Sequence, residues 1–288
     1  MIYLLYNPHS NNDHNDVEVV LQGKSKSNVT KISLLEYDVR DLLPKLTSGD
    51  KVLVCGGDGT LSRFATNTYG FDFPCPVCVL KSGTGNDFVR DINETEKDKI
   101  EKLIDIRPYL KNLPTVEVKG IKAKFINGAG FGLDGEVCYE VEQQKKRSKK
   151  KASYTAAALK LILGGYKLPK ARVIVDGVIR EYKNVWLVST MKGRYYGGGM
   201  MVAPNQDRNS DIITVMVFHN CSRAKAMTIF PSVYKGGHVK HTDVVEFIRG
   251  KHVKVEYDIP TVLQIDGEIV IGVRSYTAYM DGYENCGK

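Results

Sequence analysis

The first hundred or so residues alternate between short apolar runs and longer stretches with helical spacing. We expect strands at Ile2–Tyr6, Val29–Ser33, Val52–Cys55 and Val77–Leu80. We expect helices in a polar stretch up to about Leu21, over Tyr37–Leu46, and from Leu61 onward, where apolar side chains recur at i, i+3 and i+4. Strands that alternate with helices in this way predict a mostly parallel sheet covered by helices.

Three polar or glycine-rich segments follow strands of this predicted sheet. They are Asn7–Asn11, Gly56–Thr60 and Gly83–Asp87. Ligands of such sheets bind outside the carboxyl ends of the strands. We therefore expect the three loops to converge on one ligand site.

The pattern changes near Pro114, after which strand-like runs dominate. They are Val116–Val118, Phe125–Ile126, Arg172–Val175, Val185–Val188, Ile212–Val217, Val253–Tyr257 and Val262–Ile265. Asp176-Gly177 and Asp266-Gly267 lie between such runs and are typical of hairpin turns. Helical spacing returns only at Ser153–Leu163 and around Ala224–Tyr234. This part of the chain predicts a second domain that is mainly antiparallel β.

Composition is that of a soluble protein, with 42% hydrophobic and 26% charged residues among 288. No apolar run approaches the roughly 20 residues of a membrane-spanning helix. The N-terminus lacks a basic region and is interrupted by Pro8, so a signal peptide is not expected. Six scattered cysteines favour a reducing, cytoplasmic location. Cys75 and Cys78 form a lone C-x-x-C that runs into a strand, which favours buried cysteines over a redox or metal site.

The net charge of +8 favours an anionic partner. Much of the excess lies in residues 145–151, where six of seven residues are Lys or Arg. This run is either a solvated charged surface or a contact with an anionic membrane, at which each cation contributes about 1 kcal/mol. Nucleic acid is not expected as a partner, because no aromatic residues interleave with the basic ones.

The most informative motif is Gly56-Gly57-Asp58-Gly59-Thr60, between a strand and a helix. Glycines let backbone N–H groups approach an anion, and the helix N-terminus adds a positive dipole end. The segment Gly83–Phe88 supplies a second such loop. Neither the Walker A pattern nor the protein-kinase motifs are present. Together the two loops indicate a site for a nucleoside triphosphate.

These two motifs, with the opening Asn7-Pro8-His9-Ser10 and the later Gln264-Ile265-Asp266-Gly267-Glu268, resemble the diacylglycerol kinase catalytic family. The resemblance extends over nearly the whole chain. It implies an α/β N-terminal domain with a parallel sheet, like that of NAD kinases and phosphofructokinases, and a mainly antiparallel, β-sandwich-like C-terminal domain. The expected domains are residues 1–117, with a return segment at 276–288, and residues 118–275. The active site would lie in a cleft between them.

The resemblance also implies roles for individual residues. The nucleotide would be bound by Asn7, Pro8, His9, Ser10, Asn11, Thr30, Gly56, Gly57, Asp58, Gly59, Thr60, Thr84, Asn86 and Asp87. The acidic positions that the family joins through water and magnesium are Asp58, Asp87, Asp134 and Asp266. Asp58 would help to organise Mg-ATP, while Glu268, together with Asp266, would activate the acceptor hydroxyl. Side chains at i and i+2 share a face, so these last two carboxylates are expected to serve one site.

A structural magnesium ion is a further implication of the family. Its ligands would be the Asp211 carboxylate and the carbonyl oxygens of Arg208 and Ile213. The family has Asp-Gly where this chain has Asp211-Ile212. An ordinary loop aspartate therefore stays open as the alternative.

The predicted function is an ATP-dependent lipid kinase that phosphorylates a lipid hydroxyl, with diacylglycerol converted to phosphatidic acid as the first expectation. The expected cofactors are ATP and Mg²⁺. The protein would act in the cytoplasm, peripherally on an anionic membrane, and a homodimer is left open. The alternatives are a phosphotransferase like NAD kinase and a non-catalytic, nucleotide-binding regulator with the same fold.

Overall fold

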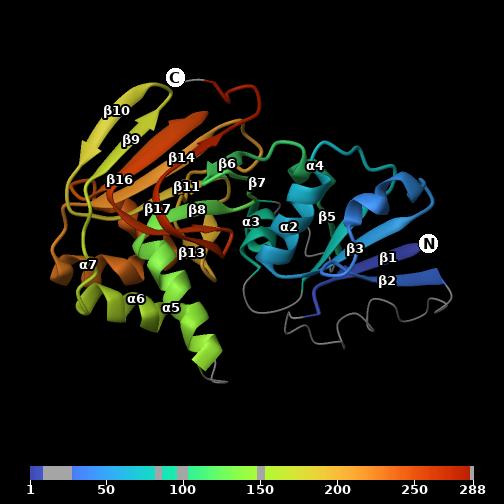
Figure 1. The fold of residues 1–288 in the computed structure, drawn as a ribbon, viewed down its shortest axis with the longest axis horizontal. Helices are drawn as coiled ribbons and strands as arrows, with labels where there is room; N and C mark the ends of the chain where they lie inside the picture. The colour runs from blue at the N-terminus through green and yellow to red at the C-terminus, as the bar shows by residue number, and fades with distance from the viewer. Residues whose placement is uncertain (9–27, 82–85, 96–102, 148–152, 286–288) are drawn as a thin grey trace. The chain divides into compact units, whose positions relative to one another are not determined.

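The computed structural model describes residues 1–8, 28–81, 86–95, 103–147 and 153–285 (Figure 1). The chain divides into two compact units, Met1–Leu113 and Pro114–Lys288. Among the described residues, no helix combines the length and the apolar character needed to cross a bilayer.

The first unit is built on a sheet whose described strands have the order β2-β1-β3-β4-β5. Its strands are β1 (Ile2–Tyr6), β2 (Val29–Ser33), β3 (Lys51–Gly56), β4 (Val77–Lys81) and β5 (Leu103–Asp105). Its helices are η2 (Val39–Asp41), η3 (Leu43–Lys45), α2 (Asp58–Thr68), α3 (Asp87–Thr95) and α4 (Arg107–Leu110). The first four strands are parallel, as predicted, and β5 pairs antiparallel with β4.

Two helix predictions in the first unit were wrong in detail. The segment 37–46 forms the short 3₁₀ helices η2 and η3, not one α-helix. Pro44 lies in the middle of it and can neither donate a backbone hydrogen bond nor avoid a clash with the preceding turn. The helix α2 begins at Asp58, earlier than expected, with Gly57 as its N-cap. Asp58 is thus a residue of the first helical turn.

The second unit contains a large antiparallel sheet with the order β15-β14-β11-β8-β16-β17-β6-β7 among the described residues, and β9 and β10 pair alongside β16. The strands of the second unit are β6 (Thr115–Val118), β7 (Ile121–Lys124), β8 (Gly128–Gly132), β9 (Ala171–Val175), β10 (Val178–Tyr182), β11 (Val185–Met191), β12 (Tyr195–Tyr196), β13 (Met200–Met201), β14 (Ile213–His219), β15 (Val245–Gly250), β16 (His252–Ile265) and β17 (Glu268–Tyr279). The prediction of a mainly antiparallel second domain is confirmed.

The long strand β16 gives the sheet its sandwich-like form. Its first half, Val253–Tyr257, pairs with β9, whereas its end, Leu263–Ile265, pairs with β8. The register with β17 shifts between Glu256 and Thr261. Apolar side chains from both parts fill one buried core, which includes Phe131, Val255 and Tyr276.

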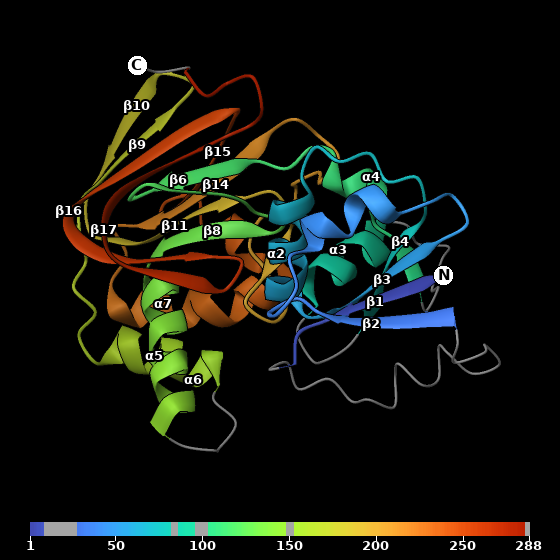
Figure 2. The ribbon, with the colours of Figure 1, turned by 45° about the vertical axis from the view of Figure 1, so that its right-hand side comes forward.

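Helices cover one side of this sheet. They are α5 (Leu133–Arg147), α6 (Tyr154–Leu163), α7 (Arg223–Ile229), η4 (Phe230–Lys235) and η5 (Gly237–Lys240). Figures 1 and 2 show α5, α6 and α7 side by side, and a second apolar core lies between them and strands β11 and β14. The long helix α5 was not expected. The stretch predicted as one helix around Ala224–Tyr234 is split at Pro231 into α7 and η4.

The boundary between the units differs from the expected one. The first unit ends at Leu113, and β6 already belongs to the sheet of the second unit. Residues Thr277–Tyr279 pair with β6, so they lie in the second unit and do not return to the first. The physical reason is that β17 runs on past the expected return point and pairs with β16 as far as Tyr279.

Close packing of α5 on β16 predicts that Gly135→Ala destabilises the second unit. A Cβ at Gly135 would lie 2.0 Å from the carbonyl oxygen of Val262, so the helix would have to shift. We expect a loss of about 3 kcal/mol in the free energy of unfolding, as in other overpacked interiors. Trp186 is the only tryptophan and is fully buried in this unit, so its fluorescence in urea reports the change. Gly49→Ala, with open space around the new methyl group, is the control. Equal unfolding midpoints for both variants would contradict the prediction.

Candidate active site

Asp58 joins the two glycine-rich motifs of the first unit. Its carboxylate accepts hydrogen bonds from the backbone N–H groups of Asp87 and Phe88, both at 2.9 Å. Asp87 and Phe88 are the first two residues of helix α3. The Asp58 carboxylate therefore caps the N-terminus of this helix, although it lies 29 residues before Asp87 in the chain. A carboxylate in the middle of a glycine turn is thereby explained, because it ties the segment Gly56–Thr60 to the first turn of α3.

The segment Gly56–Thr60 and the start of α3 at Asp87 lie at the carboxyl edge of the parallel sheet. Tyr6 pairs with Cys55 and Gly56 pairs with Lys81, so the strands β1, β3 and β4 end level with one another. Asn7 and Pro8 follow β1 at this edge. Asn86 and Asp87 are buried, whereas Thr30 is exposed on β2. The predicted nucleotide residues His9, Ser10, Asn11 and Thr84 lie outside the described residues.

The hairpin that carries Glu268 is fixed by the carboxylate of Asp266. Asp266 and Gly267 have φ values of 46° and 93°, the geometry of a two-residue type I′ turn, and Ile265 pairs with Glu268 across it. The Asp266 carboxylate accepts the backbone N–H groups of Ile126, Asn127 and Gly128, at 2.7, 2.9 and 3.0 Å. The turn is therefore pinned to the start of β8.

The expectation that Asp266 and Glu268 share a face was wrong. The chain reverses between them, so the strand alternation on which it relied does not apply. Asp266 is 7% exposed and faces backbone N–H groups, while Glu268 is exposed at the first position of β17. Asp176 behaves in the same way in its own hairpin, where its carboxylate accepts the N–H groups of Lys251 and His252. Asp266 thus holds the turn, and Glu268 is the carboxylate that remains open to solvent.

A buried side chain, Gln264, connects this turn to helix α5. Its Nε2 donates to Asp134 Oδ2 at 2.9 Å, and its Oε1 accepts the N–H of Gly267 at 2.8 Å. Burial raises the pKa of Asp134 to about 6, although hydrogen bonds from Gln264 and Tyr196 oppose the shift. Gln264 belongs to the motif Gln264–Glu268, but no role was predicted for it, because its partner Asp134 lies 130 residues away in the chain.

The four expected acidic residues form two pairs within the units. Asp58 and Asp87 are joined in the first unit, and Asp134 is joined through Gln264 to the turn of Asp266 in the second. Among the residues that the structure describes, no three His, Cys, Asp or Glu side chains are grouped closely enough to hold a metal ion. Binding of magnesium by the acidic network therefore stays a prediction.

The loop expected to hold a structural magnesium does not fit that ion. The Asp211 carboxylate forms an ion pair with Lys251. The ammonium of Lys192, which is 1% exposed, donates to the carbonyl oxygen of Ser210 at 2.6 Å. Burial lowers the pKa of Lys192 to about 8, and Asp207 and Asp211 oppose that shift. Two ammonium groups already neutralise this loop and would repel a divalent cation. The guanidinium of Arg208 donates to Ile126 O and Asn127 Oδ1, which holds this loop against the start of β8.

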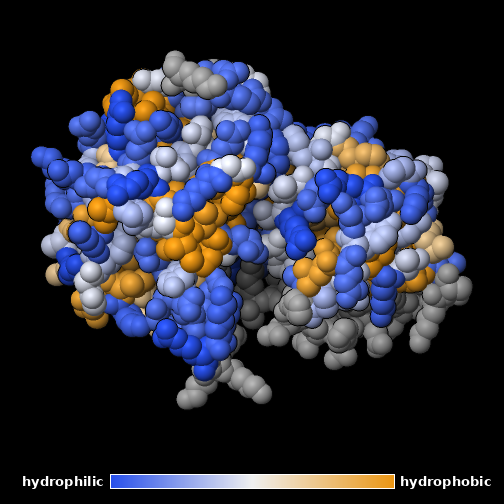
Figure 3. Space-filling model, in the orientation of Figure 1, coloured by the Kyte–Doolittle hydropathy of each residue, from blue (hydrophilic) through white to orange (hydrophobic). Residues whose placement is uncertain are grey.

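The described part of the basic run forms the exposed end of α5. Lys145, Lys146 and Arg147 occupy its last turn, where cations interact favourably with the helix dipole. The rest of the run, residues 148–151, lies outside the described residues. Figure 3 shows this hydrophilic end of α5 on the same face of the second unit as an apolar patch. Ile121 of β7 and Ile271 of β17 are exposed apolar side chains of this unit.

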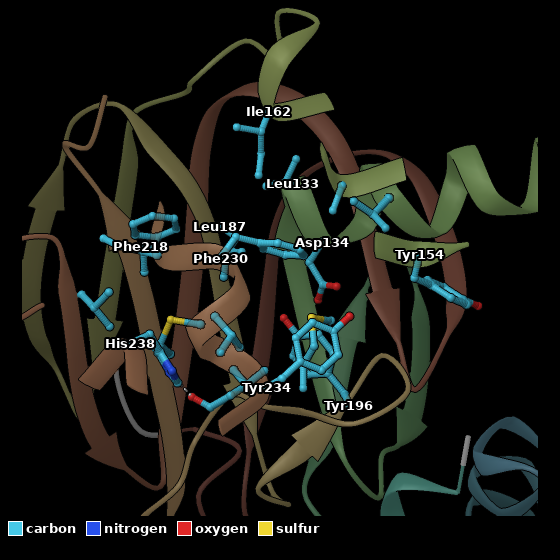
Figure 4. A pocket seen from close by; sticks show the side chains of 18 residues that line it. Leu133, Asp134, Tyr154, Ile162, Leu187, Tyr196, Phe218, Phe230, Tyr234 and His238 are labelled. Atoms are coloured by element: carbon cyan, nitrogen blue, oxygen red, sulfur yellow. Dashed lines mark hydrogen bonds between the residues drawn. The ribbon is translucent and has the colours of Figure 1, made fainter. Parts of the chain in front are cut away.

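An apolar cavity lies between the helices and the sheet of the second unit (Figure 4). The cavity is narrow, with a volume of about 50 Å³. Its walls are almost entirely apolar, with side chains such as Leu133, Ile162, Leu187 and Phe230. The polar exceptions include Asp134, Tyr196 and His238. A narrow hydrocarbon-lined space is suited to an alkyl chain.

Two family profiles together match most of the chain. Residues 1–113 match the diacylglycerol kinase catalytic domain. Residues 128–277 match the YegS C-terminal NAD kinase beta sandwich-like domain.

Individual relatives agree with these profiles. The chain is 27% identical to a diacylglycerol kinase of Mycobacterium tuberculosis, over 76% of this chain and 72% of that protein. It is 24% identical to a diacylglycerol kinase of Bacillus subtilis, over 76% and 71%. The structure of a diacylglycerol kinase from Bacillus anthracis superposes with a TM-score of 0.62 at 17% identity, over 97% of this chain and 93% of that one. The fold of both units is thus shared with that protein.

The hydrogen bonds of Asp266 predict that Asp266→Ala destabilises the second unit. Three buried N–H groups would lose their acceptor, and each unsatisfied group costs about 1–3 kcal/mol. We expect a loss of at least about 3 kcal/mol, measured by the fluorescence of Trp186 in urea. Glu268→Ala removes an exposed carboxylate two residues away and should leave the midpoint unchanged. A stable Asp266→Ala variant would show that the carboxylate does not hold the turn.

The two ammonium groups in the loop 206–213 predict that folding of the second unit does not depend on divalent cations. Removal of Mg²⁺ with a chelator, without nucleotide, should shift the melting temperature reported by Trp186 by less than about 1 °C. The reason is that an ion that does not bind the folded protein cannot stabilise it. Lys192→Met should lower the melting temperature, because the carbonyl of Ser210 loses its donor. A rise of several degrees with millimolar Mg²⁺ would contradict this picture of the loop.

Proposed function

Because this chain belongs to the family of proteins with a diacylglycerol kinase catalytic domain, we propose that it is a lipid kinase that transfers the γ-phosphate of ATP to a lipid hydroxyl. The names of its relatives favour diacylglycerol as the acceptor, with phosphatidic acid as the product. One observation carries the proposal: Gln264 joins Asp134, on the wall of the apolar cavity, to the turn that presents Glu268. A lipid acceptor needs a hydrocarbon-lined space beside a proton acceptor.

In this proposal ATP binds at the carboxyl edge of the sheet in the first unit. The segment Gly56–Thr60 and the N-terminus of α2 offer backbone N–H groups to its phosphates. Asp58 keeps this segment and the start of α3 in one arrangement. Magnesium that arrives with ATP would neutralise phosphate charge and orient the γ-phosphate. Each carboxylate oxygen has two lone pairs, so Asp58 can hold α3 and still face a hydrated cation with Asp87.

The second unit would supply the acceptor. The alkyl chains would occupy the apolar cavity, and the hydroxyl would lie near Glu268. Glu268 is exposed and is therefore open to an incoming hydroxyl. It would accept the hydroxyl proton as the phosphoryl group is transferred, and Asp266 would hold it in place through the turn. Transfer requires the γ-phosphate bound by the first unit to reach this hydroxyl.

The substrate would be met at a membrane surface from the cytoplasmic side. The exposed end of α5 carries Lys145, Lys146 and Arg147, and the ammonium of Lys145 lies 5.9 Å from the ring of Tyr154, which lines the cavity. Clustered cations attract anionic headgroups. A bilayer at this end of α5 would bring lipid close to the wall of the cavity.

A phosphotransferase like NAD kinase is the rival that shares this fold. The acceptor of such an enzyme is a polar dinucleotide, which an apolar cavity would not recognise. The lining of the cavity therefore favours a lipid.

Loss of the proton acceptor predicts a large loss of activity in Glu268→Gln. We expect kcat to fall at least about 100-fold, the usual contribution of a general base, with little change in folding because the side chain is exposed. The measurement is transfer of labelled phosphate from ATP to diacylglycerol in vesicles with anionic phospholipid. Glu181→Gln, at an exposed position of β10, is the matched control and should retain full activity.

Two outcomes would overturn the proposal. One is labelled phosphate in NAD but in no lipid. The other is full lipid phosphorylation by both Glu268→Gln and Asp58→Ala.

A further inference from the structure

One ring nitrogen of a histidine in the wall of the cavity has no hydrogen-bond partner among the described residues. His238 of η5 is 1% exposed and lines the cavity (Figure 4). Its Nε2 lies 2.9 Å from the carbonyl oxygen of Val202. Its Nδ1 is buried and has no hydrogen-bond partner among the described residues. Buried polar atoms are nearly always paired in folded proteins, so a partner is expected from outside the described residues, and a ligand in the cavity can supply it.

The contact with Val202 decides the chemistry of that partner. A carbonyl oxygen only accepts hydrogen bonds, so Nε2 carries the proton and donates it. Burial lowers the pKa of His238, the hydrogen bond to Val202 opposes this shift, and His241 acts in the same direction as burial, so the neutral ring is favoured at pH 7. Nδ1 of a neutral ring protonated at Nε2 bears a lone pair. It is an acceptor that requires an O–H or N–H donor.

The hydroxyl groups of neighbouring tyrosines are directed elsewhere. Tyr196 bonds to Ser189 Oγ at 2.9 Å and also to Asp134. Tyr234 bonds to Thr155 Oγ1, also at 2.9 Å. The ring of His238 is held in place by packing on Phe247, with 5.7 Å between ring centroids. The acceptor is thus fixed in position before any ligand enters.

We infer that the occupant of the cavity donates a hydrogen bond to His238 Nδ1, so the preferred acceptor lipid carries a hydroxyl or amide N–H in addition to the hydroxyl that is phosphorylated. This inference rests on the proposed function and refines its substrate. The esters of diacylglycerol only accept hydrogen bonds, and its one hydroxyl is the phosphate acceptor. Diacylglycerol would leave Nδ1 unpaired and would therefore be used less efficiently than a lipid with a second donor.

The test compares lipids that differ by one donor. In the first pair, diacylglycerol is compared with its analogue in which one ester oxygen is replaced by N–H. In the second pair, monoacylglycerol is compared with its 2-deoxy analogue. The measurement is kcat/KM for each lipid in the same anionic vesicles. We expect the wild-type protein to favour the donor-bearing lipid of at least one pair by about tenfold.

Variants of His238 separate recognition from folding. His238→Phe keeps an aromatic ring beside Phe247 but removes the acceptor, and the preference should disappear. His238→Gln retains an N–H for Val202 and an oxygen that accepts, and part of the preference should return. His241→Gln, three residues away and not part of the cavity wall, should keep the wild-type preference. The ratio of two lipids in one variant is insensitive to the folded fraction.

The outcomes distinguish the inference from the proposed function. Absence of phosphate transfer to any lipid would overturn the proposed function. Transfer without preference in either pair would overturn the inference alone, since Nδ1 would then be paired with water. That comparison uses the wild-type protein and does not depend on the folding of a variant. A preference that survives in His238→Phe would also overturn the inference.

Discussion

The hydrogen bonds of one buried carboxylate hold the second unit's part of the site together. Asp266 accepts three backbone N–H groups from residues 126–128 and so fixes the hairpin between β16 and β17 against the start of β8. Helix α5 follows β8 directly and begins with Leu133 and Asp134. Glu268, Gln264 and Asp134 therefore have their places set by one turn, and Gln264 adds a direct bond between its two sides.

In the first unit, too, an aspartate carboxylate accepts backbone N–H groups of a distant segment. Asp58 holds the start of α3 through two backbone N–H groups, as Asp266 holds the start of β8. Both aspartates stand in glycine-containing motifs, where loops would otherwise have many conformations. In each motif, glycines allow the backbone many conformations, and the hydrogen bonds of the carboxylate select one of them. Glu268 is exposed, and in the proposed function it is the carboxylate of these motifs that would accept the proton.

Features set by local patterns could be predicted from the sequence, including the parallel strands of the first unit, the antiparallel second domain and the hairpins at Asp176 and Asp266. Helix α5 was missed because its residues carry a weak apolar stripe and a basic end, so packing on β16 decides its structure. The role of Asp266 and the link through Gln264 depend on partners about 130 to 140 residues away, which spacing cannot reveal. The structural magnesium was expected from a family motif, and Lys192 and Lys251, distant in sequence, are the reason that it does not fit.

The length of helix α5 sets the distance between Asp134 and the basic end of the helix. Asp134 lies in its first turn and Arg147 at its last position, which separates them by about 20 Å along a straight helix. The hydrocarbon core of a bilayer is about 30 Å thick. If headgroups rest against the basic end and the helix stands along the membrane normal, a lipid must rise by about 20 Å to bring its polar end to Asp134, which is more than the depth of one leaflet, about half of that thickness. In the proposed function each alkyl chain would then have left the membrane, so the helix would act as a spacer that makes extraction, and not lateral contact, the condition for reaching the site.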